Sequence, residues 1–330
     1  MATESSSERG KDGREKPAGD MSRSRFPDEI VDAHHHFWQL GRFPYRWLAP
    51  DAPPRPFGDH GPIKRDYLPE DYRRDLDGLP VTASVHVQAN CGAADPSDET
   101  AWLAGLAGTH GRPDAVVGYA NLTAPDIAEV LAAHAAYPIC RGIRALVAWD
   151  GESRWSFADR PGVLGERDFR RGTEALTRFG FSLDLVVLPG QLHEVAALAA
   201  ELPELTVIVD HLAMPRPGEA GDIDRWADGM AAVAAQPNAV IKLSGLWTID
   251  MSWHVEALEP FVAASLAAFG AERVMYGSNL PIEKLMCPAR RQIEVLTAII
   301  DRADPAALSA VFSQTARRIY RLPAAMEPST

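Results

Sequence analysis

Residues 30–36 read Ile-Val-Asp-Ala-His-His-His, a short apolar run that ends in three histidines. Seven further apolar runs follow along the chain, at residues 82–88, 115–121, 142–147, 182–188, 206–211, 239–244 and 273–277. Between them lie longer segments rich in alanine and leucine, such as residues 99–107, 126–136, 166–179, 191–200, 223–235 and 255–268. This alternation is typical of repeated strand–helix units and predicts a parallel sheet covered by helices.

The number of runs decides between two α/β architectures. An open doubly wound sheet and a closed barrel both cover their strands on two faces, so both give nearly uniform apolar runs. Eight runs fit a barrel, and the first run is not followed by the Gly-x-Gly-x-x-Gly turn of a dinucleotide-binding sheet. We therefore predict an α/β protein with a (β/α)8 TIM barrel.

Two connections are unusually long, at residues 39–81 after the first predicted strand and at residues 148–166 after the fourth. Both contain Trp, Pro and Arg, and loops of this length in a compact enzyme are more often lids or binding walls than linkers. Residues 1–25 have almost no large apolar side chain, which predicts a disordered tail. Residues 26–325 are expected to form one barrel domain.

Charge and composition exclude several classes of partner. The 330 residues carry a formal net charge of -12, so no basic field attracts nucleic acid or an anionic membrane surface. The chain has no run of about 18 apolar residues and no signal-peptide pattern at its start, so no membrane partner is expected. The three cysteines, Cys91, Cys140 and Cys287, are scattered. This usage fits a reducing compartment, and we predict a cytoplasmic protein.

Polar residues recur where the predicted strands end, and a barrel brings all its carboxyl strand ends to one face. His34 and His36 are two residues apart, so in an extended strand they point the same way and His35 points outward. Two neutral imidazoles at this spacing suit a divalent ion such as Zn²⁺. His211 follows another apolar strand, where a polar residue has no packing reason. A pair of buried, hydrogen-bonded histidines is the structural alternative.

Other strand-end residues are candidates for substrate binding. Arg141 and Arg144 could clamp a carboxylate with their planar guanidinium groups, and either could instead form a salt bridge. His86 lies inside the second predicted strand, where a core histidine bonded to a neighbour is nearly as good an explanation as a role in a site.

Several segments together resemble the lactonase-like branch of the amidohydrolase superfamily, the branch of L-fuconolactonase, 4-sulfomuconolactone hydrolase and 2-pyrone-4,6-dicarboxylate lactonase. The matching segments are residues 32–38 (DAHHHFW), 67–71 (YLPED), 86–89 (HVQA), 141–144 (RGIR), 210–212 (DHL), 242–246 (KLSGL) and 276–281 (YGSNLP). Their order and their placement at successive strand ends cover most of the chain.

The resemblance implies roles for individual residues. His34, His36 and His211 match metal-binding or substrate-binding histidines, and Asn279 occupies the position of an aspartate that serves as general base or metal ligand in the family. An amide cannot take a proton from water, so the resemblance leaves the base open among His211, His86, Glu283 and Asp210. The further substrate-binding candidates are Trp38, His86, Gln88, Arg141 and Arg144. A divalent ion held by His34, His36 and His211 and a metal-free site are both compatible with the family.

The expected function is hydrolysis of a lactone or similar cyclic ester of an organic or sugar acid, with the carbonyl held by histidines and arginine. The expected partner is a small molecule that carries a carboxylate, and a homo-oligomer stays open. Because Asn279 replaces the aspartate, a non-hydrolytic reaction such as decarboxylation is one alternative. A catalytically silent ligand-binding barrel is another.

Overall fold

The computed structural model describes residues 26–151, 155–216, 222–250 and 255–324. The predicted tail at residues 1–25, and residue 325 at the end of the predicted domain, lie outside the described residues. Both the tail and the assignment of residues 26–325 to one domain stay predictions.

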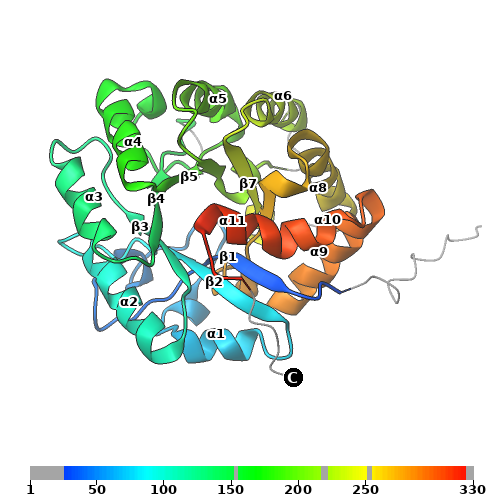
Figure 1. The fold of residues 1–330 in the computed structure, drawn as a ribbon. Coiled ribbons are helices and arrows are strands. Elements are labelled where there is room, and N and C mark those ends of the chain that lie inside the picture. Colours follow the sequence, from blue (N-terminus) through cyan, green and yellow to red (C-terminus); the bar gives the residue numbers. More distant parts are fainter. Residues whose placement is uncertain (1–25, 152–154, 217–221, 251–254, 325–330) are drawn as a thin grey trace, which may run out of the picture.

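Eight parallel strands form one sheet in sequential order, with a ring of helices outside it (Figure 1). The strands are β1 Ile30–His35, β2 Val81–Val87, β3 Ala115–Tyr119, β4 Cys140–Leu146, β5 Ser182–Val186, β6 Val207–Val209, β7 Ala239–Leu243 and β8 Val274–Tyr276. Each pairs in parallel with the next. The prediction of a (β/α)8 barrel is confirmed.

The barrel closes between β1 and the segment that follows β8. The backbone N–H of Asn279 donates to the carbonyl of His34 at 2.7 Å, and that of His36 donates to the carbonyl of Leu280 at 2.7 Å. Buried Asp32 reinforces the junction, because it accepts hydrogen bonds from the Ser278 N–H at 2.8 Å and the Ser278 hydroxyl at 2.6 Å. These contacts fix the direction in which His34 and Asn279 leave their strands.

Most of the helices cover the outside of the sheet. The helices of the described residues are α1 Pro69–Asp75, α2 Asp98–His110, α3 Ile127–Ala135, α4 Arg167–Phe179, α5 Leu192–Glu201, α6 Asp222–Ala234, α7 Leu246–Ile249, α8 Val255–Phe269, α9 Ala289–Ala303, α10 Ala307–Ser309 and α11 Thr315–Tyr320. In α4, the buried side chains Phe169, Thr173 and Leu176 recur at helical spacing and form the face toward the core. The helix ends at Gly180, which takes the left-handed conformation that glycine adopts without strain (φ 63°).

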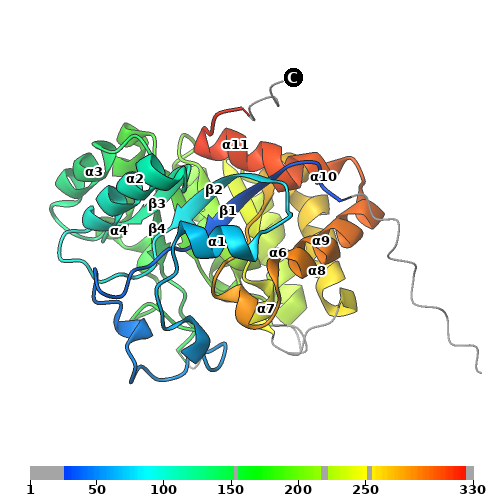
Figure 2. The ribbon, with the colours of Figure 1, turned by 90° about the horizontal axis from the view of Figure 1, so that it is seen from below.

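The two mouths of the barrel differ. At one mouth, Ala316 and Tyr320 of α11 pack with Val31 and Ala33 of β1 in one apolar cluster. At the other mouth, the connection from β1 to β2 extends beyond the strands, as the blue segment on the side opposite α11 in Figure 2 shows. This connection holds the short helices η2 Arg46–Leu48 and η3 Gly61–Ile63. Long loops after β1 and β4 were predicted, and both are present.

No helix among the described residues is long and apolar enough to cross a bilayer.

Candidate active site

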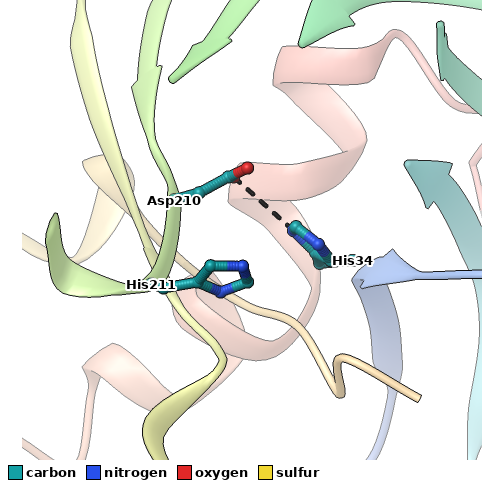
Figure 3. A group of neighbouring side chains, drawn as sticks. All are labelled: His34, Asp210 and His211. Atoms are coloured by element: carbon teal, nitrogen blue, oxygen red, sulfur yellow. Dashed lines mark ion pairs between the residues drawn. The ribbon is translucent and has the colours of Figure 1, made fainter. Parts of the chain in front are cut away.

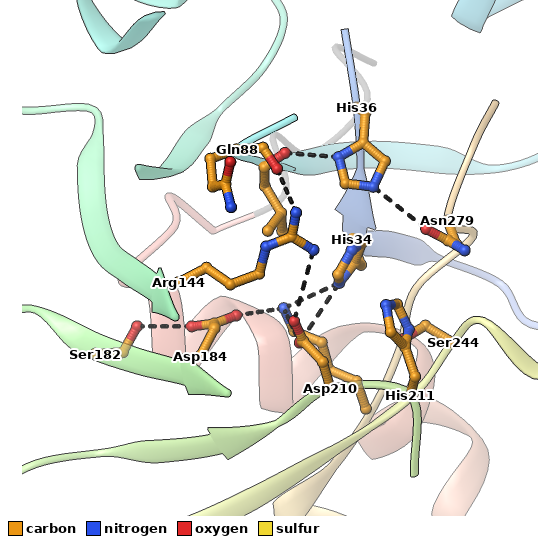
Figure 4. A network of polar contacts seen from close by, with 12 residues as sticks. His34, His36, Gln88, Arg144, Ser182, Asp184, Asp210, His211, Ser244 and Asn279 are labelled. Atoms are coloured by element: carbon orange, nitrogen blue, oxygen red, sulfur yellow. Dashed lines mark hydrogen bonds and ion pairs between the residues drawn. The ribbon is translucent and has the colours of Figure 1, made fainter. Parts of the chain in front are cut away.

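Three imidazoles meet at the open mouth of the barrel (Figure 4). The ring centroids of His34 and His36 are 5.1 Å apart, and those of His34 and His211 are 4.6 Å apart. His35 turns to the other side of β1, where its ring lies 4.5 Å from that of Phe37 and 4.4 Å from that of Tyr72. The alternation predicted for this strand therefore brings His34 and His36 together and directs His35 into the helix layer.

The tautomer of His36 is set by the backbone. Its Nδ1 lies 2.7 Å from the carbonyl oxygen of Val87. Because a carbonyl only accepts, Nδ1 carries the proton, and Nε2 of the neutral ring presents a lone pair. Burial lowers the pKa of His36 well below its ordinary value, and the nearby charge of Arg144 acts in the same direction. His36 is therefore neutral near pH 7, and its Nε2 carries no proton.

Asn279 faces this nitrogen with its amide oxygen. The His36 Nε2 and Asn279 Oδ1 atoms are 3.3 Å apart, while the Asn279 amide donates from Nδ2 to Glu283 at 3.0 Å. Glu283 is fully buried and also accepts the backbone N–H of Trp247. Burial raises the pKa of Glu283 to about 7. The resemblance leads us to expect an aspartate at position 279. The Glu283 carboxylate is instead hydrogen-bonded to the Asn279 side chain that occupies this position.

A buried charge network lies beneath the imidazoles. Lys242 Nζ is 2.5 Å from Asp184 Oδ2 and 3.2 Å from Asp210 Oδ1, and all three side chains are fully buried. Burial acts to raise the pKa of Asp210, but the charge of Lys242 and the contact with His34 hold it well below its ordinary value. His34 Nδ1 lies 3.5 Å from Asp210 and 3.4 Å from Lys242. Asp210 is therefore a fixed anion and a poor proton acceptor.

His211 is held by an unusual backbone. It follows β6 with φ 56°, in the left-handed region, and Leu212, Ala213 and Met214 also have positive φ. Its Nδ1 lies 2.8 Å from the Ser244 hydroxyl. A Cβ on Gly245, where φ is +65°, would stand 2.5 Å from the same nitrogen, so only glycine leaves room for the ring. Burial lowers the pKa of His211 to about 4.

Part of this group fits a divalent ion. His34, Asp210 and His211 each offer a ligand atom, and these atoms lie within 4.8 Å of one another (Figure 3). Nε2 of His34 is buried and has no hydrogen-bond partner among the described residues. Neutral imidazoles with one carboxylate are a donor set that suits Zn²⁺. The predicted set contained His36 in place of Asp210, and Lys242 at 3.2 Å would compete with an ion for this carboxylate.

A cavity of about 690 Å³, measured out to its open mouth, lies above these residues. Its inner part presents His36, Arg144, His211 and Asn279. Its other lining residues are Trp47, Arg55, Phe57, Ala89, Asn90, Leu146, Trp155, Phe157, Val186, Met214, Gly245, Thr248, Ile249 and Ile282.

Arg144 reaches the cavity and Arg141 does not. Arg144 is buried, its Nη2 donates to the Gln88 carbonyl at 2.5 Å, and its Nη1 lies 4.0 Å from Asp210. Arg141 is the second residue of β4, and it does not line the cavity. Burial, and then the charge of Arg321, lower its pKa. Of the two arginines, the structure therefore brings only Arg144 to the cavity, and a role of either in substrate binding stays a prediction.

Three other substrate-binding candidates, His86, Trp38 and Gln88, form hydrogen bonds or ion pairs with protein groups next to the site. His86 Nδ1 accepts the N–H of Phe37 at 3.0 Å, and its Nε2 lies 3.7 Å from the Glu99 carboxylate. Trp38 is fully buried and donates from Nε1 to a backbone carbonyl at 2.7 Å. The Gln88 side chain donates to Asn90 at 3.3 Å. None of the three lines the main cavity, and their contact with substrate stays a prediction.

Sequence reasoning did not single out Arg55, Trp47, Phe57, Trp155 and Phe157, which form the outer wall of the cavity. The available signal was the Trp and Arg content of the two long connections. Periodicity does not fix the path of a loop, so it could not select these residues.

The sequence profile of the amidohydrolase family matches residues 31–322. An L-fucono-1,5-lactonase of Burkholderia multivorans is 31% identical over 309 residues, which are 89% of this chain and 96% of that protein. Among solved structures, an amidohydrolase from Burkholderia multivorans with bound zinc is similar, with a TM-score of 0.74 and 30% identity over 89% of this chain and all of that one (100%). A 5-carboxyvanillate decarboxylase from Novosphingobium aromaticivorans, in complex with manganese, shares the fold at TM-score 0.60 and 14% identity, over 93% of this chain and 98% of that one.

Proposed function

This chain belongs to the amidohydrolase family, and we propose that it is a hydrolase that opens a lactone or similar cyclic ester of an organic acid. The observation that carries the proposal is the placement of neutral His36, neutral His211, Arg144 and Asn279 around the inner part of one cavity. The fuconolactonase relative supports the choice of a cyclic ester among the substrates of hydrolases.

We assign the general base to His36. His36 lines the cavity and its Nε2 carries no proton, so it is suited to take a proton from the water that attacks the carbonyl. The N–H formed in this way would point at the Asn279 oxygen, 3.3 Å away, and the Asn279 amide is in turn bonded to Glu283. His86 and Glu283 do not line the cavity, and Asp210 is held as an anion by Lys242.

Hydrogen-bond donors at the inner end of the cavity are suited to stabilise the negative charge that develops on the carbonyl oxygen. Arg144 is a buried cation whose Nε has no hydrogen-bond partner among the described residues, so it is suited to bind a carboxylate of the substrate or the developing oxyanion. His211, fixed by Ser244, lies on the same lining. Water adds to the carbonyl carbon, the ring C–O bond breaks, and the leaving oxygen takes back a proton, which gives a hydroxy acid.

The test of this proposal is acid release from a panel of lactones, followed in a pH-stat. We expect wild-type protein to open at least one lactone, and we expect His36→Ala to lower kcat by about 100-fold or more, because a general base contributes about 10²- to 10⁴-fold. His193→Ala is the matched control, since His193 is exposed and its partner among the described residues is Asp228, at 2.9 Å. No acid release from any lactone, or equal kcat in the two variants, would contradict the proposal.

We further propose that His34, Asp210 and His211 hold a divalent ion, which would polarise the carbonyl as a Lewis acid. The zinc-bound relative supports this assignment. Elemental analysis of purified protein is expected to find about one ion per chain, and His211→Ala is expected to retain less than a tenth of it, because loss of one of three protein ligands opens the site. His193→Ala is the reference variant, and it is expected to keep the metal content of the wild-type protein. Metal-free wild-type protein with full activity would overturn this assignment.

Decarboxylation is the second candidate, because Asn279 removes the aspartate expected for hydrolysis and a decarboxylase shares the fold. It predicts release of CO₂ from carboxylated aromatic compounds. If none is released while a lactone is opened, this candidate fails.

A further inference from the structure

The outer half of the cavity is an aromatic wall that comes from two separate loops. Trp47 and Phe57 belong to the connection between β1 and β2, and Trp155 and Phe157 belong to the connection after β4. The rings of Phe57 and Trp155 lie 6.5 Å apart at 37°, so the two loops meet at this wall. Leu146 and other apolar side chains continue it inward.

The Trp47 ring is fixed, and its polar atom is already used. Its Nε1 donates to the Ala89 carbonyl at 2.8 Å. His60 stacks on the ring at 6.0 Å and 17°, and Trp38 meets it edge-on at 5.3 Å. His60 is buried and is itself held to the Trp47 carbonyl at 2.8 Å. The indole therefore offers the cavity an apolar face whose position is set before a ligand arrives.

Arg55 is the one cation of this outer wall, and it lacks a counter-ion among the described residues. It is half-buried, and burial lowers its pKa, although a guanidinium stays charged near pH 7. Among the described residues, no carboxylate lies within 4.0 Å of it and its side chain forms no hydrogen bond, and burial is the one cause of its lowered pKa. The chain carries 45 acidic and 33 basic residues. A desolvated cation left unpaired in an acidic protein points to an anion brought by the ligand.

The same wall offers few groups to hydroxyls besides Arg55. The Thr248 hydroxyl already donates to the Gly245 carbonyl at 2.7 Å, and the Asn90 amide oxygen already accepts from Gln88 at 3.3 Å. The remaining polar lining groups lie at the inner end, around His36, Arg144 and Asn279. A polyhydroxylated sugar lactone would leave hydroxyls without partners against apolar side chains, which is unfavourable.

We propose that the substrate is an anionic lactone with a flat apolar body, in which the body lies against Trp47, Phe57 and Trp155 and the anionic group pairs with Arg55. This inference rests on the proposed function, because it requires the lactone carbonyl to face His36 at the inner end. The reaction is ordinary hydrolysis: the elements of water add across the acyl C–O bond, and the product is a hydroxycarboxylate that keeps the original anion.

Three lactones distinguish the effects of an anionic group, a flat apolar body and hydroxyl groups on turnover. Dihydrocoumarin is flat and neutral, its ring-carboxylated derivative is flat and anionic, and L-fucono-1,5-lactone is neutral and polyhydroxylated. For wild-type protein we expect kcat/KM to be highest for the carboxylated compound and at least tenfold lower for the sugar lactone. Arg55→Met is expected to lower kcat/KM for the carboxylated compound by about 10- to 100-fold, mainly through KM, as for loss of a charge-assisted hydrogen bond. For the neutral aryl lactone, the kcat/KM of the same variant should stay within about twofold of the wild-type value.

Arg46→Met is the matched control, because Arg46 is exposed on the same loop and does not line the cavity. It should behave as wild type with all three lactones, and Arg55→Lys should retain part of the preference for the anion. Equal losses for neutral and anionic aryl lactones in Arg55→Met, or a sugar lactone turned over as well as the carboxylated one, would overturn the inference.

A binding measurement separates this inference from the proposed function. The hydroxydicarboxylate that forms from the ring-carboxylated dihydrocoumarin, which keeps the anionic group meant for Arg55, is titrated into the protein by calorimetry, which requires no turnover. We expect about tenfold weaker binding to Arg55→Met and unchanged binding to Arg46→Met. If no lactone is opened but this difference is found, the proposed reaction fails and the subsite stands. If lactones are opened but the acid binds equally to wild type and Arg55→Met, the subsite fails alone.

Discussion

Acidification from pH 7 to about pH 5 is expected to unfold the protein cooperatively. The reason is a set of six histidines whose pKa values are all lowered, first of all by burial. His34, His35, His36, His86 and His134 are buried, and His211 is partly buried. The folded state keeps these rings neutral, whereas the unfolded chain binds protons below about pH 6.5. Stability is therefore complete above that pH and is lost as the pH falls through it.

The size of the effect follows from linkage. Each ring that stays neutral in the folded state costs about 1.4 kcal/mol per pH unit below the unfolded pKa. The four rings whose pKa is lowered furthest, those of His34, His35, His36 and His211, therefore cost roughly 6 kcal/mol per unit. Raised pKa values of Asp32, Asp184 and Glu283, caused by burial, offset part of this cost because these carboxyls bind protons more readily when folded. The remaining loss is comparable to the whole stability of a domain, about 5–15 kcal/mol.

His35 provides the variant that tests the cause. Neither of its ring nitrogens has a hydrogen-bond partner among the described residues, and Phe37 and Tyr72 surround the ring. We expect His35→Phe to raise stability at pH 7 by about 1–3 kcal/mol, since it removes an unsatisfied buried polar group, and to shift the acid midpoint downward. Circular dichroism against pH and urea unfolding at pH 7 measure both effects.

Exposed His193 gives the control, and His193→Gln should leave the midpoint unchanged. Wild-type protein that stays folded to pH 4, or a His35→Phe midpoint equal to that of wild type, would show that the buried rings do not determine the acid limit.

The barrel and its histidines could be predicted because both depend on local pattern. Eight apolar runs specify eight strands, and the spacing of His34 and His36 specifies a shared face. The same rule argues against one prediction, since Arg141 and Arg144 are three residues apart and must point to opposite faces of a strand. The structure places only Arg144 on the cavity.

Other features depend on register and on loop paths, which a single sequence does not contain. His86 is the cross-strand partner of His35, so it shares the outward face and supports the barrel wall. The predicted strand at residues 206–211 ends at Val209, because Asp210 and His211 enter a short helix with left-handed residues that no motif signals. Arg55 lies in a long connection, and only the folded loop brings it to the cavity.

Asn279 shows how context changes the meaning of a motif. The sequence indicates the loss of an acidic group, but Glu283, four residues later, returns a buried carboxylate to within 3.0 Å of the Asn279 amide. An aspartate at position 279 would set two carboxylates against each other, which strongly raises the pKa of one of them. The amide and the buried glutamate are therefore compatible as a pair.

Removal of the Lys242 charge is expected to destabilise the folded state by about 3–5 kcal/mol, the cost of breaking a buried ion pair by removing one partner. Lys242 contacts Asp184 at 2.5 Å and Asp210 at 3.2 Å, and none of the three side chains is exposed (0%). Lys242→Met keeps most of the volume and leaves two carboxylates without their cation. Urea unfolding at pH 7.5 measures the loss.

Two comparisons isolate the charge from the packing. Lys284 pairs with Asp75 at 2.5 Å, but both side chains are partly exposed (23% and 25%), so Lys284→Met should cost no more than about 1 kcal/mol. Adding Asp184→Asn to Lys242→Met should recover part of the loss, because it removes one of the two unpaired anions. A Lys242→Met protein within about 1 kcal/mol of wild type, or no recovery in the double variant, would mean that Asp184 and Asp210 do not depend on this lysine. In that case Asp210 could take up a proton, and the assignment of the base to His36 would lose its support.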